Sequence, residues 1–470
     1  MIKRYYATKD NTISNAFEEN LTTRATGSNM GASDILETFS IYNQVSNSSG
    51  ISSELARILI EFDTAHLTND RTAGKLPASG SVSWYLKMFN APHSQTVPSD
   101  FNIEVLGVSA SWEEGYGIDM DYYEDLTRDV IGSNWIRRAG TTAWTTPGGD
   151  YHAAPTFTQT LETGLEDMEL DVSHLVEQWL AGTKDNYGFG IKLPTATEGL
   201  AKSFYTKKFF GRDSEFFFQR PVLEARWDSA RQDDRGYFYA SSSLASATDN
   251  LNTLYLYNRI RGRLRDIPTT PTSASLRSSR TGSDLYTSAV TRESTGIYKA
   301  DLFLDTAETK LYDVWWTSGS TGITAYHTGA IDVKSFESSG YNPEDTFVLS
   351  MPSLRDEYRK SQTHRLNLYV REKNWSPNIY TQAVRTAIPS LIIPSASFQL
   401  RRGIDDYIVV SYGTGSNMHT GLSYDVSGNY FDLDTTYLEA GYLYDIQYSF
   451  YDEENGWEEQ PYRFKFRVVD

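Results

Sequence analysis

The chain has 470 residues, and its 43 Lys and Arg stand against 61 Asp and Glu, which gives a formal net charge of −18. Such an acidic chain is a poor general binder of nucleic acid, because phosphate contacts need a cationic face. It has no cysteine, which excludes disulfides, thiolate nucleophiles and Cys-ligated metals. Its 32 Tyr and 22 Phe can fill a packed core, so bulk disorder is excluded as well.

The N-terminal residues give no sign of export. Lys3 and Arg4 are not followed by an apolar stretch, so the sequence predicts no secretory signal and synthesis in a cytoplasm. No apolar run along the chain is long enough for a transmembrane helix, and no membrane partner is expected.

The first part of the chain alternates apolar and polar residues with a period of two. In the stretch 56–62, Ile58, Ile60 and Phe62 fall on one face, and the stretches 85–89 and 101–108 follow the same rhythm. This alternation predicts strands with one buried face. Clusters of turn-forming residues such as Ser46–Gly50 separate them, which favours an all-β sandwich.

One segment, Asp171–Gly182, has a helical period instead. Val172, Leu175, Val176 and Trp179 recur at i, i+3, i+4 and i+7, as in an amphipathic helix of about three turns. Asp171 or Ser173 can cap its start, and Gly182 can end it.

The composition changes twice along the chain, and these changes predict three domains. Residues 1–230 are expected to form a β-sandwich with one short helix, and 231–338 and 339–470 each have the size of an immunoglobulin-like β-sandwich. A polar, Ser-rich stretch begins at Asp228, and Ser338–Pro343 resembles a second linker.

Several segments of residues 1–227 resemble the DNRLRE domain, a β-sandwich related to carbohydrate-binding jelly rolls. They occur in the family's order: 56–62, 111–115, 144–149, the helix 171–182 with Asn186–Phe189, and Arg220–Glu224. The resemblance implies an architecture more than an activity, since such domains are often non-catalytic parts of surface and extracellular proteins.

The last third of the chain resembles the ends of virion structural proteins from tailed phages. The segments that carry this resemblance are Tyr412–Thr414, Leu422–Leu433 and Trp457–Val468. It implies a component of a phage particle, without saying which one.

Motifs for catalysis or cofactor binding are not found. The seven histidines, at 66, 93, 152, 174, 327, 364 and 419, show no zinc-binding spacing. The sequence contains no GxSxG nucleophile elbow, no GxxxxGK[ST] loop and no GxGxxG turn. No cofactor and no catalytic residue is therefore predicted.

Acidic residues cluster after Trp112. Glu113 and Glu114 next to an aromatic ring are typical of glycosidases. Oxygen ligands also suit calcium, and the weak calcium candidates are Asp119, Asp121, Glu124 and Asp125. The third interpretation, a solvated acidic loop between strands, is the commonest fate of such a run.

Tryptophans in loop-like stretches of the first domain are candidates for stacking against sugar rings. Trp112 and Trp144 are the residues proposed for this role, with Trp135 in a similar stretch. A buried position at the base of the sandwich is the competing interpretation.

The sharpest pattern is a row of arginines in 254–265. Leu254, Leu256, Ile260 and Leu264 occupy the even positions, whereas Tyr255, Tyr257, Arg259, Arg261, Arg263 and Arg265 occupy the odd ones. As one strand, this segment would place four arginines on one face at intervals of about 6.6–6.8 Å. Such a row could grip carboxylates of a neighbouring subunit, or pair with acidic residues of an adjacent strand of its own sheet.

Together these patterns predict a non-catalytic structural component of a tailed-phage virion. It would be made in the host cytoplasm and decorate or brace the particle, in the head, neck or tail. Its partners would be other virion proteins and further copies of itself in a symmetric assembly. The alternative is an adhesin that binds a glycan through the first domain, and the third hypothesis is a glycoside hydrolase or lyase that uses the carboxylates near 113–125.

Overall fold

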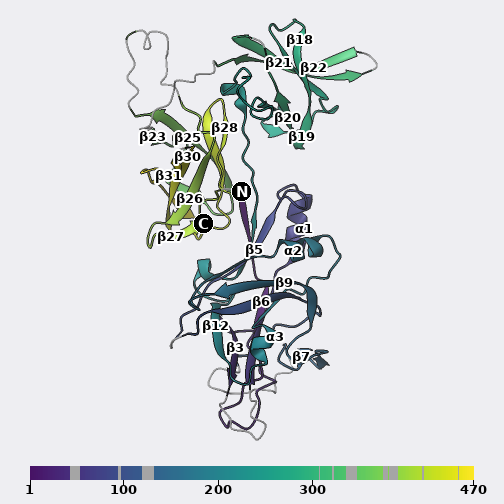
Figure 1. The fold of residues 1–470 in the computed structure, drawn as a ribbon, viewed down its shortest axis with the longest axis vertical. Coiled ribbons are helices and arrows are strands. Elements are labelled where there is room, and N and C mark those ends of the chain that lie inside the picture. The colour runs from purple at the N-terminus through teal and green to yellow at the C-terminus, as the bar shows by residue number, and fades with distance from the viewer. Residues whose placement is uncertain are drawn as a thin grey trace. The chain divides into compact units, whose positions relative to one another are not determined.

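The computed structural model describes residues 1–42, 53–93, 97–118, 132–305, 307–319, 322–334, 347–373, 379, 390–414, 418–453 and 455–470. The chain divides into two compact units, Ile2–Trp227 and Asp228–Asp470. Strands dominate both units (Figure 1), so the all-β fold class predicted from the sequence is confirmed. The division lies close to the predicted boundary at 230, whereas the predicted boundary at 338 lies outside the described residues.

The first unit contains two large antiparallel sheets. The four-stranded sheet consists, in spatial order, of β1 (Ile2–Tyr6), β13 (Val222–Arg226), β5 (Ser83–Met88) and β10 (Met168–Asp171). The seven-stranded sheet consists of β12 (Phe204–Phe210), β3 (Ile35–Tyr42), β4 (Ser53–Glu61), β11 (Phe189–Lys192), β6 (Phe101–Val108) and β9 (Tyr151–Leu161), with β2 (Lys9–Ser14) paired to β4. A small hairpin joins β7 (Arg137–Ala139) to β8 (Thr142–Ala143).

The period-two rhythm explains which side chains form the core of this unit. Along β5, Trp84, Leu86 and Met88 are buried, while the residues between them are half-buried. β4 differs, because Ile58, Leu59 and Ile60 are all fully buried. A strand in a sheet that is covered on both faces has no solvent-exposed face, so apolar and polar residues need not alternate along it.

Three α-helices are present among the described residues of the first unit: α1 (Thr64–Thr72), α2 (Ser173–Leu180) and α3 (Thr195–Glu198). The helix predicted at 171–182 is α2, and it buries Leu175, Val176 and Trp179. Asp171 accepts hydrogen bonds from the backbone and hydroxyl of Ser173, and Gly182 follows the helix with φ +69°. Helices α1 and α3 were not predicted from the sequence. Their nine and four residues, respectively, carry little apolar periodicity.

The second unit begins with an immunoglobulin-like sandwich. One sheet consists of β14 (Asn252–Tyr257), β20 (Ile297–Leu302) and β19 (Thr291–Ser294). The other consists of β18 (Asp284–Ala289), β17 (Ser273–Arg277), β21 (Lys310–Gly319) and β22 (Gly322–Asp332). Side chains of both sheets, including Tyr298 and Trp315, share one core with Phe238, which lies beyond the short 3-10 turn η3 (Asp234–Gly236).

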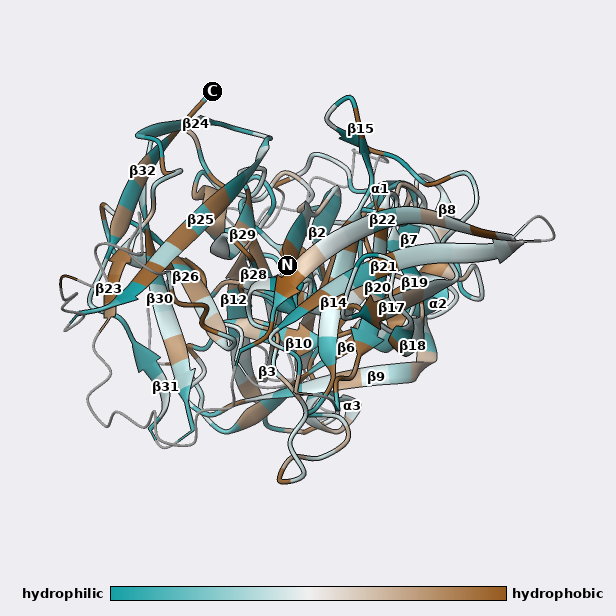
Figure 2. Ribbon diagram, turned by 90° about the horizontal axis from the view of Figure 1, so that it is seen from above, coloured by the Kyte–Doolittle hydropathy of each residue, from teal (hydrophilic) through white to brown (hydrophobic). Residues whose placement is uncertain are grey.

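A second sandwich of the same kind completes this unit. Its four-stranded sheet consists of β23 (Phe347–Ser350), β25 (Thr363–Glu372), β29 (Gly428–Asp434) and β28 (Ser423–Asp425). Its six-stranded sheet consists of β24 (Glu357–Arg359), β32 (Phe464–Val469), β30 (Leu443–Asp452), β26 (Ala396–Arg402) and β27 (Tyr407–Val410), with β31 (Gly456–Glu459) paired to β30. The two sheets face each other, since the rings of Phe398 and Phe431 stack 4.1 Å apart. Figure 2 shows the alternating hydropathy along β25 and β32 that this packing requires.

A buried carboxylate lies in the four-stranded sheet of the first unit. Glu224 on β13 is 1% exposed and accepts hydrogen bonds from Nε of Arg4 at 2.6 Å and Nε of Arg226 at 2.7 Å. Burial alone would raise the pKa of Glu224, but the cations of Arg4, Lys87 and Arg226 lower it to about 2. Ionised Glu224 therefore stabilises the folded state above its ordinary pKa of 4.5.

This pKa predicts how the first unit responds to acid. As the pH falls from 4.5 towards 2, the first unit should lose about 3 kcal/mol of unfolding free energy through this group, because the unfolded chain takes up the proton first. Glu224→Gln should be less stable at pH 7 and should lack this part of the pH dependence. The measurement is urea unfolding at several pH values, read for residues 2–227 of the full chain by pulse-labelling hydrogen exchange.

The exposed Glu215 of the same unit provides the control, and Glu215→Gln should keep the pH dependence of the original chain. An unchanged acid response in Glu224→Gln would contradict the assignment.

Candidate functional sites: an arginine hairpin and a polar hollow

The arginine row does not form one strand. β14 ends at Tyr257, and residues 259–265 form a separate β-hairpin in which β15 (Arg259–Ile260) pairs with β16 (Arg263–Leu264). Arg261 and Gly262 make the turn with φ +51° and +76°. Two successive positive φ angles are the geometry of a tight two-residue hairpin turn, and glycine supports it without strain.

This turn corrects the prediction of four arginines on one face. Residues directly opposite in an antiparallel pair share a face, so Arg259 lies with Leu264, and Arg263 lies with Ile260 on the other face. Arg261 is at the turn, and Arg265 follows the second strand. We call residues 259–265 the arginine hairpin; β15 projects from the surrounding ribbon in Figure 2.

All four guanidinium groups of the arginine hairpin are on exposed residues. Within the described part of the chain, none of them forms an ion pair with an acidic side chain. The carboxylate next in sequence, Asp266, is already held by Nε and Nη2 of Arg292, both at 3.0 Å. The interpretation in which this row is neutralised by its own sheet is therefore wrong for the described residues.

The base of the arginine hairpin is fixed by backbone contacts. Asn258 accepts a hydrogen bond from the backbone N–H of Arg265 at 3.0 Å, and its side-chain amide donates to the Arg265 carbonyl at 2.6 Å. The backbone N–H of Asn258 donates in turn to the carbonyl of Gly296 at 2.8 Å. The hairpin is thus anchored to the loop between β19 and β20, while its charged side chains stand in solvent.

Tyr255 and Tyr257, predicted to dock with the arginines, belong to β14 and turn towards the protein. Tyr255 is buried, so it is not a surface anchor, and Tyr257 is half-buried. Burial first, and then contacts with Glu293 and Tyr430 respectively, raise the pKa of both phenols. The two rings stack 6.1 Å apart and are part of the interior of the second unit.

The tryptophans proposed for glycan stacking are also buried. Trp112 is 3% exposed and Trp144 is 5% exposed, and both pack with Trp135 against Ile13 and other apolar residues. The indole N–H of Trp112 donates to the Tyr187 carbonyl at 2.8 Å, and that of Trp144 donates to the Asn134 carbonyl at 2.9 Å. Their faces are unavailable to a sugar, so the prediction of a stacking site at these residues is wrong.

The carboxylates near these tryptophans have structural partners. Glu114 accepts hydrogen bonds from the Asp10 backbone at 2.8 Å and from Nε of Arg212 at 2.7 Å. Glu113 accepts one from the Gly140 backbone at 3.2 Å. The calcium candidates Asp119, Asp121, Glu124 and Asp125 lie outside the described residues.

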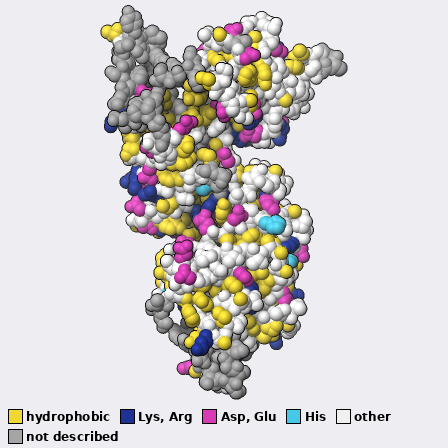
Figure 3. Space-filling view, viewed as in Figure 1, with side chains coloured by type: hydrophobic (Ala, Val, Ile, Leu, Met, Phe, Trp, Pro, Cys, Tyr) yellow, Lys and Arg dark blue, Asp and Glu magenta, His cyan; other side chains and the backbone are white. Residues whose placement is uncertain are grey.

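Among the described residues, no group of three or more His, Asp or Glu side chains is arranged to hold a metal ion. No described helix is long and apolar enough to cross a membrane. In Figure 3, acidic and basic side chains are interspersed over the visible face.

The second unit also contains a polar hollow with a volume of about 990 Å³, which was not predicted from the sequence. It lies where the segment before β14 passes the sheet of β14 and β20. The residues that line it are Gln232, Asp234, Tyr237, Tyr239, Ala240, Ser242, Ala245, Thr248, Asp249, Asn250, Leu251, Asn252, Thr253, Lys299, Asp301, Lys334 and Tyr424. In the sequence, the region that lines this hollow is a Ser- and Asn-rich stretch with two tyrosines, and such a composition favours a linker.

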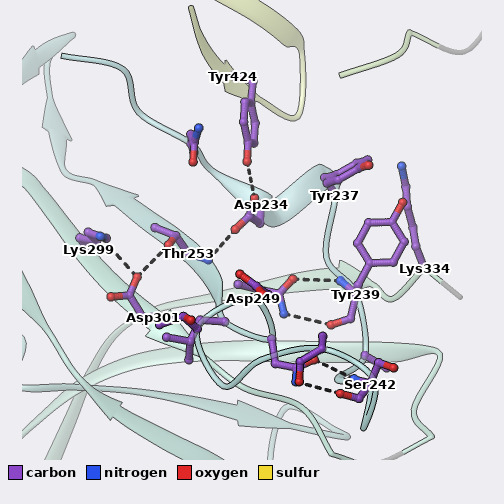
Figure 4. A pocket seen from close by; sticks show the side chains of 17 residues that line it. Asp234, Tyr237, Tyr239, Ser242, Asp249, Thr253, Lys299, Asp301, Lys334 and Tyr424 are labelled. Carbon is purple, nitrogen blue, oxygen red and sulfur yellow. Dashed lines mark hydrogen bonds and ion pairs between the residues drawn. The ribbon is translucent and has the colours of Figure 1, made fainter. Parts of the chain in front are cut away.

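Two sides of the hollow differ in chemistry (Figure 4). On one side, Asp301 accepts a hydrogen bond from the Thr253 hydroxyl at 2.7 Å and pairs with the Lys299 amine at 3.5 Å. On the other, the rings of Tyr237 and Tyr239 meet edge to face at 4.8 Å. The amine of Lys334 lies 4.7 Å above the Tyr237 ring.

Asp234 lies between these two sides. It accepts hydrogen bonds from the Tyr424 hydroxyl at 2.7 Å and from the Thr253 backbone at 2.6 Å. Burial raises the pKa of Asp234, although these two hydrogen bonds oppose the effect. Both carboxylate oxygens of Asp234 already accept hydrogen bonds from the protein. Asp234 therefore holds Tyr424 and Thr253 in place in the wall of the hollow.

Comparison with known proteins identifies no family. No family model matches the chain, and no curated protein matches it. Solved structures similar to it include a tandem pair of titin Ig domains, at 9% identity and TM-score 0.15, covering 42% of this chain and 82% of that one. A second titin structure has 10% identity and TM-score 0.15, with 51% and 95% covered. The native conformation of alpha-2-macroglobulin from E. coli has 10% identity and TM-score 0.16, with 88% of this chain and 21% of that chain covered.

Burial of the tryptophans predicts a stability effect in place of a binding effect. Trp112→Ala should lower the unfolding free energy of the first unit by about 3–5 kcal/mol, because it removes a large buried ring and leaves a cavity. Urea unfolding of the full chain, read for residues 2–227 by pulse-labelling hydrogen exchange, measures this loss. Trp457→Ala, at a half-buried site on β31, should leave those residues unchanged. A loss below about 1 kcal/mol in Trp112→Ala would contradict the burial.

Proposed function

We propose that this chain is a non-catalytic structural component of a tailed-phage particle, which it decorates or braces through protein–protein contacts of its β domains. The observation that carries the proposal is the arginine hairpin. Four exposed guanidinium groups without acidic partners among the described residues stand on a rigid base in a chain of net charge −18.

The chemistry of arginine explains why such a hairpin favours docking onto protein. A guanidinium group is planar, stays charged and can hold a carboxylate with two parallel hydrogen bonds. Four of them close together repel one another, which a partner rich in Asp and Glu would relieve. Other copies of this acidic chain are one such partner, and a symmetric assembly repeats one contact many times.

The assignment to a phage particle is supported by the resemblance of the C-terminal segments to virion proteins of tailed phages. These segments overlap β28, β29, β31 and β32 of the last sandwich. The resemblance of residues 1–227 to DNRLRE domains supports an architectural role for the first unit. The alternative, an adhesin acting through Trp112 and Trp144, is not proposed further, because both rings are buried.

Neutralising the arginine hairpin should release the chain from its particle. An exposed ion pair contributes about 0.2–1 kcal/mol, so Arg259→Gln, Arg261→Gln, Arg263→Gln and Arg265→Gln together should weaken docking by about 1–4 kcal/mol, or roughly fivefold or more. The measurement is the ratio of this chain to the major capsid protein in purified particles, by quantitative mass spectrometry. Circular dichroism of the isolated variant should be unchanged, because these side chains are exposed.

Two controls separate this effect from a loss of net charge. Four other exposed arginines, changed together as Arg137→Gln, Arg355→Gln, Arg359→Gln and Arg467→Gln, give the same change in net charge elsewhere and should leave incorporation unchanged. Replacing the four hairpin arginines with lysine should give an intermediate loss, since charge is kept but the bidentate geometry is not. Normal incorporation of the glutamine variant of the hairpin would overturn the docking role.

A further inference from the structure

The polar hollow has the size of a small-molecule site, with a lining that is more polar than is usual for such sites. Its volume of about 990 Å³ lies at the upper end of the range for such sites, about 300–1,000 Å³. Its lining comes mainly from 232–253, the stretch that also contributes Phe238 to the core of the sandwich, with Lys299 and Asp301 on β20 as the opposite wall.

The loop that forms one wall is held in place by two asparagines. Asn250 accepts from the Ser242 backbone at 2.7 Å and donates to the Ser242 carbonyl at 2.9 Å. Asn252 makes the same two contacts with the backbone of Tyr239, at 3.0 Å and 2.9 Å. Because the backbone is fixed before any ligand arrives, binding would cost little ordering of this loop.

The charges of the lining select a class of ligand. Asp234, Asp249 and Asp301 bring three carboxylates, of which that of Asp234 already accepts hydrogen bonds at both oxygens, whereas Lys299 and Lys334 bring two amines. An anion such as phosphate would meet the carboxylates, and a cationic peptide would meet the amines. A neutral ligand with many hydroxyl groups satisfies both, since a hydroxyl donates to a carboxylate and accepts from an ammonium group.

The aromatic side chains fit the same class. Tyr237 and Tyr239 are half-buried, and their rings line the hollow at an interplanar angle of 81°. An aromatic ring offers an apolar body beside a polar tip, which suits a ligand that combines C–H faces with hydroxyl edges. Saccharides have this combination.

We propose that the polar hollow is a binding site for a neutral saccharide segment. Tyr239 and Tyr237 contact the apolar face of a sugar ring, while Asp301, Asp249 and Lys299 bind its hydroxyl groups. The site belongs to the second unit, whereas the buried tryptophans Trp112 and Trp144 belong to the first. It does not use the arginine hairpin, so it stands apart from the docking function.

Titration calorimetry of the full chain tests the proposal. The probes are four neutral hexasaccharides (maltohexaose, cellohexaose, mannohexaose and chitohexaose) and two acidic ones (hexagalacturonate and a heparin hexasaccharide). At least one neutral probe should bind with a dissociation constant below about 1 mM. Tyr239→Ala should weaken this binding at least tenfold, and Asp301→Asn should weaken it about fivefold or more.

A second variant is needed because Tyr239→Ala could lose binding simply by disturbing the fold. Thr248 lines the hollow on an exposed loop, so Thr248→Trp should fill the space without disturbing the core and should abolish binding. Tyr451→Ala, an exposed tyrosine elsewhere in the same unit, should bind the probe as the original chain does, and so should the glutamine variant of the arginine hairpin. The absence of binding by every neutral probe, tighter binding of an acidic probe, or unchanged binding in Thr248→Trp would each overturn the proposal.

Discussion

The burial of one face of each sheet against another layer is the constraint on which the rest of the structure depends. In the second unit, Tyr298 from one sheet and Trp315 from the other share a single core. Side chains that pack in the core are not available for binding, and much of both candidate sites comes from segments that connect strands. The arginine hairpin and the wall of the polar hollow are both connections that lead into or out of β14.

Buried charged side chains also hold the layers of the second unit together. Asp313 on β21 is fully buried, and Nη1 and Nη2 of Arg235 donate to its two oxygens at 2.8 and 2.6 Å. Burial would raise the pKa of Asp313, but these hydrogen bonds hold it below its ordinary value. Removing one partner would leave a charge buried without compensation, so such pairs tie the residues before β14 to the sheet of β21.

The fold was predictable from the sequence because its main signal is local. The alternation at 85–89 and the helical period at 171–182 depend only on neighbours, and both elements are present as β5 and α2. The sites depend on information that is not local. The alternation at 254–265 continues in phase through a turn, so only Gly262 signalled that the strand reverses there. Trp112 and Trp144 are buried by residues such as Ile13 that are distant in sequence, and no periodicity in the loops reveals that.

The docking proposed for the arginine hairpin would act over a short range. At physiological ionic strength the Debye length is about 8 Å, so exposed charges are screened beyond the width of a few water layers. The chain as a whole repels other acidic surfaces only weakly at a distance, while the guanidinium groups act at contact. A contact made through this hairpin, as proposed, would therefore act at short range and weaken as salt rises, so that raising the ionic strength would release a partner bound there.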